Sequence, residues 1–523
     1  MTLQALSRRL AALSLAALPA LATPSPARAQ AGGAEAATAA ALERLRASPP
    51  RLYAFLREMP KGGDLHMHLS GAVYAESFLR WAAEDSLCVS RRALAIVWTT
   101  PCAGGDTIPA AAAQRDGTLY GELIDAWSMR NWDHARNSGH DQFFATFAKF
   151  GATDRRTGDE LAEAMSRAAA GRVSYQELMV TLDGRVATSL GSQVLGDSAF
   201  TPGREPDFAA ARQALLQAGI ANAVAAGRQN ATRIEARRDT VLRCGTPQAD
   251  PGCGVTVRWL YQVLRGLAPQ QVFAQILTGF ELAKADPRVV GFNLVMPEDG
   301  LVSMRDFTLQ MRMIDYLHPF YPQVKISLHA GELAPGLVPP EGMRFHVRQS
   351  VELGHASRIG HGVDVLYEDR PEELLREMAR RGVLVEIALT SNDAILEVRG
   401  KDHPLSAYRA YGVPVALATD DEGVARSEMT REWVKAVEEQ GLGYRDVKTM
   451  ARASLEHAFV EGASVWSDGR RFTPVAACAP AAGGFAGARC GAFAAGSTRA
   501  RLQRDLELGF RDFEARRAAD PPP

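Results

Sequence analysis

Two histidines separated by one residue, His66 and His68, are the first side chains whose types and spacing could bind a metal. On a β-strand, residues two apart point to the same face, so both imidazoles would reach one side of the strand and could share an ion. Alone, such a pair is weak evidence, because packing or chance explains many of them. Further polar groups of the same kind strengthen it: His329 with Glu332, His361, and Asp420 with Asp421.

These polar groups lie at or near the ends of predicted strands. In a parallel barrel the carboxyl ends of all strands surround one mouth, where the active sites of such barrels form. Three imidazoles and one carboxylate suit zinc or another divalent transition metal, with one position left for water. A purely structural zinc site is a poorer interpretation, because Glu332, His361 and Asp421 would remain unexplained in the same mouth.

A metal site of this kind favours hydrolysis. Water bound to the metal has its pKa lowered towards about 7, which produces hydroxide near neutral pH. If that hydroxide attacks a ring carbon, the Glu332 carboxylic acid could give a proton to the neighbouring ring nitrogen, and His361 could orient the hydroxide. Asp420 and Asp421 can both reach the pocket if the chain turns at the strand end, and the cation would offset their repulsion.

Short β-rich segments alternate with helical stretches along most of the chain. The predicted strands cover residues 63–70, 173–181, 255–261, 289–295, 324–329, 358–365, 383–389 and 413–418. Helices are predicted between most of them, at residues 161–170, 273–285, 307–317, 371–381 and 405–411. Eight strands alternating with helices predict an α/β fold, a (β/α)8 TIM-type barrel, with a doubly wound sheet as the alternative.

The N-terminus has the pattern of a secretory signal peptide. Arg8 and Arg9 precede an apolar run at residues 10–21, and residues 27–29 form a small-x-small cleavage site. The run is too short to cross a bilayer comfortably, and no later window resembles a membrane span. We therefore predict export to the periplasm or secretion.

The remaining patterns divide the chain into a central barrel with flanking segments. The predicted organisation is a signal peptide at residues 1–29, an N-terminal helical segment at 30–58, the barrel at 59–465 with insertions near 85–150 and 183–254, and a C-terminal extension at 466–523.

Six cysteines fall into three near-neighbour pairs: Cys88 with Cys102, Cys244 with Cys253, and Cys478 with Cys490. In an exported protein these pairs predict disulfides that close short loops, with unpaired buried thiols as the alternative. No pair has a CxxC spacing, which disfavours a zinc ribbon or a thioredoxin-like role.

The composition is that of a globular protein, with 46% hydrophobic and 23% charged residues. Lys and Arg number 59 against 60 Asp and Glu, so the formal net charge is -1. A protein that binds duplexes usually carries a basic excess to neutralise phosphates. Nucleic acid is therefore not expected as a partner, and a small molecule is.

The polar groups described above stand in motifs that resemble the adenosine deaminase family of zinc hydrolases. The motifs follow one another in the family's order: Met59-Pro60-Lys61-Gly62, Leu65-His66-Met67-His68, His329-Ala330-Gly331-Glu332, Arg358-Ile359-Gly360-His361-Gly362, Thr390-Ser391-Asn392 and Thr419-Asp420-Asp421. The secretory signal and the Met-Pro-Lys-Gly opening are most similar to the family's secreted, growth-factor-like branch. The resemblance covers about residues 55–465 and implies a (β/α)8 barrel.

The resemblance also implies a reaction, the hydrolytic deamination of adenosine or 2′-deoxyadenosine to the inosine product and ammonia. It implies one zinc ion per chain, held by His66, His68, His329 and Asp420. It further implies that Glu332 protonates the purine at N1, that His361 positions the hydroxide, and that Asp421 contacts N7.

Two positions depart from the family's pattern, and neither touches the metal chemistry. In the intracellular branch an aspartate that holds the ribose stands at the position of Ser70, and a glycine whose backbone lies against the purine stands at that of Met296. Ser70 is neutral and shorter, and Met296 is bulky at a place of close approach. We therefore expect Ser70 and Met296 to contact the substrate and to influence which substrate binds.

Two other functions compete with purine nucleoside deamination. One is an amidohydrolase barrel that acts on another purine derivative or on a cyclic amide; many of these hold two metals with a carbamylated lysine at the end of the fourth strand. Residues 291–299 contain no lysine, which favours one metal. The other is a catalytically inactive periplasmic protein that binds a nucleoside or a metal, which the presence of Glu332 and His361 disfavours.

Several other residues have simpler interpretations. His346 is expected to be a surface or satisfied core residue, and Arg265 and Glu177 to be interior polar groups that serve stability. A set of aromatic residues in the first insertion either stacks over a purine pocket or packs the insertion onto the barrel: Trp127, Trp132, Phe143, Phe144 and Phe147.

Overall fold

The structure, a computed structural model, describes residues 26–98, 101–196, 200 and 205–519. The predicted signal peptide lies largely outside these ranges, and residues 26–29 form the start of helix α1 (Pro26–Leu45). Within the described ranges, no helix is long and apolar enough to cross a membrane.

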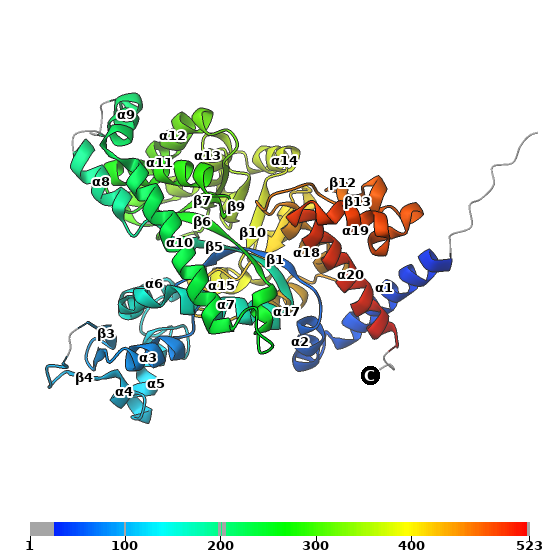
Figure 1. The fold of residues 1–523 in the computed structure, drawn as a ribbon, viewed down its shortest axis with the longest axis horizontal. Coiled ribbons are helices and arrows are strands. Elements are labelled where there is room, and N and C mark those ends of the chain that lie inside the picture. The colour runs from blue at the N-terminus through cyan, green and yellow to red at the C-terminus, as the bar shows by residue number, and fades with distance from the viewer. Residues whose placement is uncertain (1–25, 99–100, 197–199, 201–204, 520–523) are drawn as a thin grey trace, which may run out of the picture.

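Eight parallel strands form one sheet at the centre of the molecule (Figure 1). They follow one another around the sheet in chain order: β1 (Gly62–His68), β5 (Val173–Val180), β6 (Thr256–Leu264), β7 (Val289–Val295), β8 (Lys325–Ala330), β9 (Arg358–His361), β10 (Leu384–Ile387) and β11 (Val415–Leu417). A parallel bridge between Met67 and Asp420 joins the first strand to the end of the last. The predicted (β/α)8 barrel is therefore confirmed, and the doubly wound alternative is wrong.

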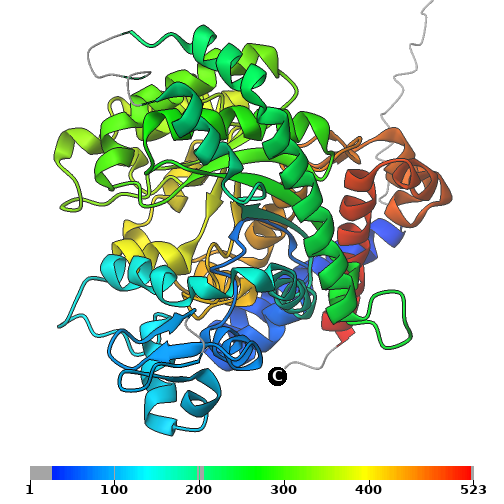
Figure 2. The same ribbon diagram turned by 60° about the vertical axis from the view of Figure 1, so that its left-hand side comes forward.

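Helices between the strands and after the last one cover the outside of this barrel (Figure 2). They are α7 (Thr157–Ala170), α11 (Pro269–Ala285), α12 (Leu301–Leu317), α13 (His346–Glu352), α14 (Pro371–Arg381), α15 (Leu389–Leu396), α16 (Leu405–Ala410), α17 (Met429–Glu438) and α18 (Tyr444–Glu456). Helix α11 shows the reason: its buried residues include Phe273, Ile276 and Phe280, spaced three and four apart, which places them on one face.

Three of the predicted strands are longer than the observed ones at the ends that face the site. Strand β9 stops at His361, whose φ of 66° turns the chain out of the extended conformation. Strand β10 stops at Ile387, and helix α15 begins two residues later. Strand β11 stops at Leu417, before the turn that carries Asp420 with a φ of 57°.

The first insertion contains elements that the sequence patterns did not predict. After α3 (Ala75–Glu84), three short strands pair antiparallel, β2 (Cys88–Ser90), β3 (Ala95–Val97) and β4 (Thr107–Pro109), followed by α4 (Ala110–Ala113), α5 (Gly117–Ala126) and α6 (Gly139–Phe150). A strand of three residues is too short to show an alternating pattern. The insertion has its own apolar core and lies to one side of the barrel (Figure 1).

The second insertion and the two flanking segments are mainly helical. The insertion contains α8 (Val186–Leu195), α9 (Phe208–Ala218) and α10 (Ile220–Leu242), of which α10 is the predicted long helix. The C-terminal extension contains β12 (Trp466–Asp468), β13 (Thr473–Pro474), α19 (Ala488–Ala495) and α20 (Thr498–Ala519). Helix α20 packs along α1 and against α2 (Pro49–Arg57), where the Phe55 and Phe513 rings lie 5.2 Å apart (Figure 1).

All six cysteines form the predicted disulfides, which join Cys88 to Cys102, Cys244 to Cys253, and Cys478 to Cys490. The Cα atoms of the pairs lie 5.7, 5.6 and 4.6 Å apart, within the usual range for disulfides. The alternative of unpaired thiols is wrong.

We expect peptide mapping of the unreduced protein to recover these three linkages. The paired cysteines are 14, 9 and 12 residues apart in sequence, and closing loops of this length stabilises the folded state by up to about 2–3 kcal/mol each. A reductant should therefore lower the melting temperature measured by calorimetry. Alkylation of all six thiols in the unreduced protein would contradict the disulfide assignment.

Candidate metal centre and catalytic pocket

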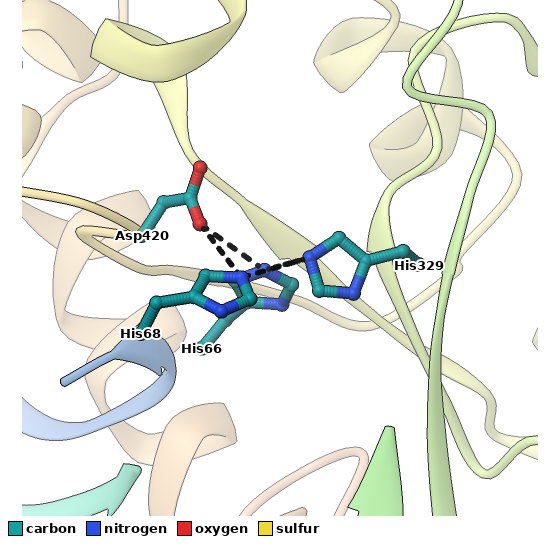
Figure 3. Close-up of side chains that lie close together, drawn as sticks. All are labelled: His66, His68, His329 and Asp420. Atoms are coloured by element: carbon teal, nitrogen blue, oxygen red, sulfur yellow. Dashed lines mark hydrogen bonds and ion pairs between the residues drawn. The ribbon is translucent and has the colours of Figure 1, made fainter. Parts of the chain in front are cut away.

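Four predicted ligands converge at the carboxyl ends of the barrel strands (Figure 3). His66 and His68 come from β1, and His329 comes from β8. The Nε2 atom of His329 lies 3.0 Å from that of His66 and 3.1 Å from that of His68. Asp420 Oδ1 lies 3.4 and 3.5 Å from the same two Nε2 atoms. One ligand atom from each residue therefore surrounds a common point.

The hydrogen bonds around the three imidazoles fit a bound cation. Each ring has its Nδ1 beside a side-chain oxygen: Glu386 Oε2 at 2.7 Å from His66, Gln262 Oε1 at 3.3 Å from His68, and Asn293 Oδ1 at 2.9 Å from His329. An oxygen at that position selects the tautomer with its proton on Nδ1, so the Nε2 lone pairs face one another. Such lone pairs repel unless a positive ion lies between them. The residues present therefore suit a divalent metal.

Asp420 is oriented as a ligand by its own hydrogen bonds. Its Oδ2 accepts from the Ser391 hydroxyl at 2.6 Å, whereas Oδ1 is buried and accepts no hydrogen bond from the described residues. The residue has a φ of 57°, a left-handed conformation that few non-glycine residues adopt. The turn after β11 therefore directs the free oxygen towards the imidazoles.

A buried network of ion pairs orients the His66 ring. Glu386, whose Oε2 contacts His66, accepts from Arg358 Nε at 2.5 Å through its other oxygen. Arg358 also donates to Glu177 at 2.5 Å, and all three side chains are fully buried. The predicted structural role of Glu177 is consistent with this network. Glu386 was missed in the sequence, although a glutamate between Val385 and Ile387 in an apolar strand is an available signal.

Glu332 lies beside the metal ligands as a buried carboxyl group that is 8% exposed. Burial raises the pKa of Glu332 well above its usual range, and the nearby Asp420 carboxylate raises it further. The raised pKa favours the protonated form of this carboxyl group, which can act as an acid. Its Oε1 lies 3.7 Å from His361 Nε2.

The backbone that carries Glu332 is held by a second glutamate, which the sequence patterns did not reveal. Glu298 accepts the N–H of Gly331 at 3.0 Å and that of Glu332 at 2.8 Å. His346 Nδ1 lies 2.5 Å from the same carboxylate, and its ring is fully buried. Burial opposes ionisation, but His346 and Arg265 lower the pKa of Glu298 to about 2, so it accepts as a carboxylate. His346 is thus a buried core residue and not a surface one, and it is hydrogen-bonded through Nδ1 only, since its Nε2 has no partner among the described residues.

His361 presents an unused donor to the pocket. The Asn392 side-chain amide donates to its Nδ1 at 3.0 Å, and the Asn392 oxygen accepts from His403 at 3.1 Å. The proton of a neutral imidazole then lies on Nε2, which is buried and has no hydrogen-bond partner among the described residues. Burial lowers the pKa of His361 to about 3, so the ring is neutral. His361 can therefore donate one hydrogen bond into the pocket.

Asp421 lies at the same mouth and is 4% exposed. Its Oδ1 has no hydrogen-bond partner in the described part of the chain. Burial raises the pKa of Asp421 well above its usual range, and Asp420 raises it further. A Cβ atom on Gly71 would lie 1.5 Å from Asp421 Oδ1, so a glycine is needed there. As a neutral acid, Asp421 can donate to a ring nitrogen.

Most of these groups line one cavity of about 320 Å³, whereas the buried His66 and His361 are not among its lining residues. Its lining residues are His68, Ser70, Phe143, Phe144, Phe147, Gln262, Leu264, Val295, Met296, Pro297, His329, Glu332, Asp420 and Asp421. The three phenylalanines come from α6 of the first insertion and line the pocket. Phe143 also packs in the core of the insertion. Trp127 and Trp132 do not line it; their indole N–H groups donate to backbone carbonyls of the insertion.

The two departures from the family pattern both line this cavity. Met296 has a φ of 89°, a conformation that suits glycine and costs another residue about 1–3 kcal/mol. Its side chain lies against Gly266, where an added Cβ would be 2.7 Å from the methionine methyl group. Both Met296 and Ser70 are exposed, so both can touch a bound molecule.

Comparisons with known proteins agree with this geometry. The model of the adenosine deaminase family matches residues 210–464. The adenine deaminase of Rhizobium etli is 26% identical over 222 residues, 42% of this chain and 62% of that protein. The adenosine deaminase of Clostridium acetobutylicum is 30% identical over 137 residues, 26% of this chain and 38% of that protein. The chain thus matches less than two thirds of the length of these relatives.

One solved structure that resembles this chain is the N6-methyl-AMP deaminase of Arabidopsis thaliana. The similarity covers 78% of this chain and 94% of that one, with 19% identity and a TM-score of 0.48. The family match over residues 210–464 and the curated relatives confirm the resemblance to the adenosine deaminase family that the sequence motifs show.

Proposed function

We propose that this protein hydrolytically deaminates adenosine and 2′-deoxyadenosine, releasing ammonia and the corresponding inosine. The observation that carries the proposal is the position of Glu332, a buried carboxyl group with a raised pKa, in the cavity that is also lined by three of the four candidate metal ligands, His68, His329 and Asp420. A structural metal site would not need such an acid beside it. Curated relatives named adenine deaminase and adenosine deaminase support attack on a 6-aminopurine.

We propose zinc as the metal, one ion per chain, held by His66, His68, His329 and Asp420. When bound, zinc supplies Lewis acidity that makes a water molecule nucleophilic near neutral pH. Three nitrogens and one oxygen are ligands that zinc accepts, and they leave room for water. The fourth barrel strand, β7, brings Asn293 to the site, and its oxygen contacts His329, so that strand offers no second metal ligand.

The chain's own groups would divide the remaining work. Glu332 delivers a proton to the purine N1, which makes C6 more susceptible to attack. His361 donates a hydrogen bond from Nε2 to the attacking water oxygen and holds it in line, and Asp421 donates a hydrogen bond to N7, which fixes the ring. Of the two protons of the water, one restores the Glu332 carboxyl group and the other passes to the amino group. The amino group leaves as ammonia when the C6–N bond breaks, and the C6–O bond is retained.

Elemental analysis of protein purified without added metal should find close to one zinc per chain. A strong chelator should abolish activity, and zinc should restore it, because the three histidines and one carboxylate form a single site. Two tightly bound metals per chain would contradict the mononuclear assignment and favour the wider amidohydrolase alternative.

A panel of aminopurines tests the reaction itself. Adenosine, 2′-deoxyadenosine, adenine and N6-methyladenosine are each mixed with the zinc-loaded protein, and ammonia and the ultraviolet spectrum are followed. We expect release from the first two to be fastest. If ammonia release is fastest from adenine, the substrate is the free base. If compounds bind but none releases ammonia, the protein is an inactive binding protein.

We also propose that the protein acts outside the cytoplasm. Support comes from the signal-like N-terminus and from the three disulfides, which are typical of proteins in oxidising compartments. Cell fractionation with the full chain should find the mature protein in the periplasm or the medium, without residues 1–29.

A further inference from the structure

The catalytic pocket adjoins a second cavity of about 600 Å³. The two share three lining residues, Ser70, Gln262 and Leu264. Beyond them, the second cavity is enclosed by the end of β5, the loop before α8, and helices α7 and α10. The two cavities therefore adjoin each other at Ser70.

Two arginines distinguish the second cavity, which we call the arginine cavity: Arg185, at the start of α8, and Arg233, on α10. Within the described ranges the Arg185 guanidinium has no ion pair and no hydrogen bond, and the Arg233 guanidinium contacts only Asn230 Oδ1, at 3.5 Å. Asn230 is itself fixed by its hydrogen bond to the Leu182 carbonyl at 2.9 Å. The buried Glu160 of α7 also lines the cavity, so its lining has two arginines and one carboxylate, and neither arginine forms an ion pair within the described ranges.

Other arginines on α10 show that free guanidinium groups are not general on this helix. Arg237 binds Asp159 at 2.7 Å, and Arg228 lies 3.8 Å from Asp286. Arg233 also lines a neighbouring surface cavity with Arg155, whose guanidinium stacks 5.1 Å from the Trp98 ring centre. That neighbouring cavity also contains Asp85 and Asp159, which pair with Arg156 and Arg237.

The lining of the catalytic pocket differs from that of the arginine cavity in its charged residues. No lysine or arginine is among its lining residues in the described part of the chain, and it contains the carboxyl groups of Glu332, Asp420 and Asp421. At the junction between the two cavities stands Ser70, a neutral residue that does not repel an anion. The combined space thus has a purine-binding end with a metal site and a second end suited to negative charge.

We propose that the arginine cavity binds an anionic group on the sugar of the substrate, a phosphate ester, so that the preferred substrate is a 6-aminopurine nucleoside monophosphate. This inference rests on the proposed function and names the substrate class for the same site. Arginine suits this ligand because its planar fork forms paired hydrogen bonds with phosphate oxygens. The deamination at C6 is unchanged, and the phosphate supplies binding only.

The test compares adenosine with adenosine 5′-monophosphate and 3′-monophosphate as substrates of the zinc-loaded protein. We expect kcat/KM for one monophosphate to exceed that for adenosine by at least about tenfold, since one charge-assisted hydrogen bond is worth roughly ten- to a hundredfold in binding. The preference should weaken as salt is raised, because the arginines are exposed. The two phosphate positions show which sugar oxygen faces the cavity.

Variants then assign the preference to the arginines. In the double variant Arg185→Gln with Arg233→Gln, the ratio of kcat/KM for the monophosphate to that for adenosine should fall at least about tenfold. Arg228→Gln removes a charge from the same helix but outside the cavity, and should leave the ratio as in the native protein. A native ratio of one or below, or a ratio unchanged in the double variant, would overturn the inference.

Binding measurements separate this inference from the proposed reaction. Inosine and inosine 5′- and 3′-monophosphate carry no amino group, so calorimetry can measure their affinity without turnover. Suppose that adenosine and its two monophosphates are not deaminated, but an inosine monophosphate binds more tightly than inosine and this difference depends on the arginines. The proposed reaction is then wrong and the anion site stands. If adenosine is deaminated and phosphate adds no affinity, the reaction stands and the anion site is wrong.

Discussion

Replacing Glu332 by glutamine is expected to lower turnover by about 10²–10⁴-fold while the protein keeps its metal and its fold. Glutamine has the same shape and can still donate a hydrogen bond, but it cannot deliver a proton to the purine. The loss corresponds to roughly 3–5 kcal/mol of activation free energy. The side chain is buried and lies outside the group of four candidate metal ligands, so metal content should stay near one per chain.

The pH dependence gives a second readout of the same role. The pKa of Glu332 is raised by burial and by the Asp420 carboxylate, so the acid form that can deliver a proton persists to a higher pH than in an ordinary carboxyl group and is lost as the pH rises through the raised pKa. Turnover of the native enzyme should therefore fall on the alkaline side, and Glu332→Gln should lack this decline. Near-normal turnover in the variant would refute the assignment, and loss of zinc together with activity would show that Glu332 is a ligand.

The second large effect is expected at Asp420. Asp420→Asn replaces an anionic ligand by a neutral amide of the same size, so metal affinity and turnover should fall together. The fall in affinity should exceed the roughly 10–100-fold that loss of a supporting hydrogen bond costs. Elemental analysis after dialysis, followed by titration with zinc, measures it.

The adjacent residue supplies a matched control. Asp421→Asn makes the same chemical change one position later, at a side chain that is equally buried but outside the group of four ligands. We expect this variant to keep about one zinc per chain and to have a raised KM. Equal zinc loss in both variants would mean that the turn after β11 acts as a whole, and the ligand assignment of Asp420 would be wrong.

Much of the candidate site could be predicted because its signals are local. Residues two apart on a strand point to the same face, which placed His66 and His68 together before any fold was known. Strand ends meet at one mouth of a barrel, which brought His329, His361 and Asp420 to the same place. The disulfides also follow from short spacing, because the paired cysteines are at most 14 residues apart.

The supporting groups could not be predicted in this way, because their partners are far apart in the chain. Glu386 contacts His66 across 320 residues, and Arg358 contacts Glu177 across 181. No periodic pattern links such positions, and the choice among many buried acids depends on how the strands are placed around the barrel. The same holds for Glu298, which reaches the Glu332 backbone from a different strand end, 34 residues earlier.

The sequence by itself determined the fold class, the paired cysteines and the metal-binding and catalytic residue types, since each depends on local period, order and spacing. Only the tertiary structure decided which oxygens orient the histidines, which phenylalanines line the pocket, and that Arg185 and Arg233 border one cavity. Both arginines lie in the second insertion, Arg185 at the start of α8 and Arg233 on α10, with α9 between them in sequence. Their proximity to Ser70 arises from packing, in which contact depends on distance in space and not on distance along the chain.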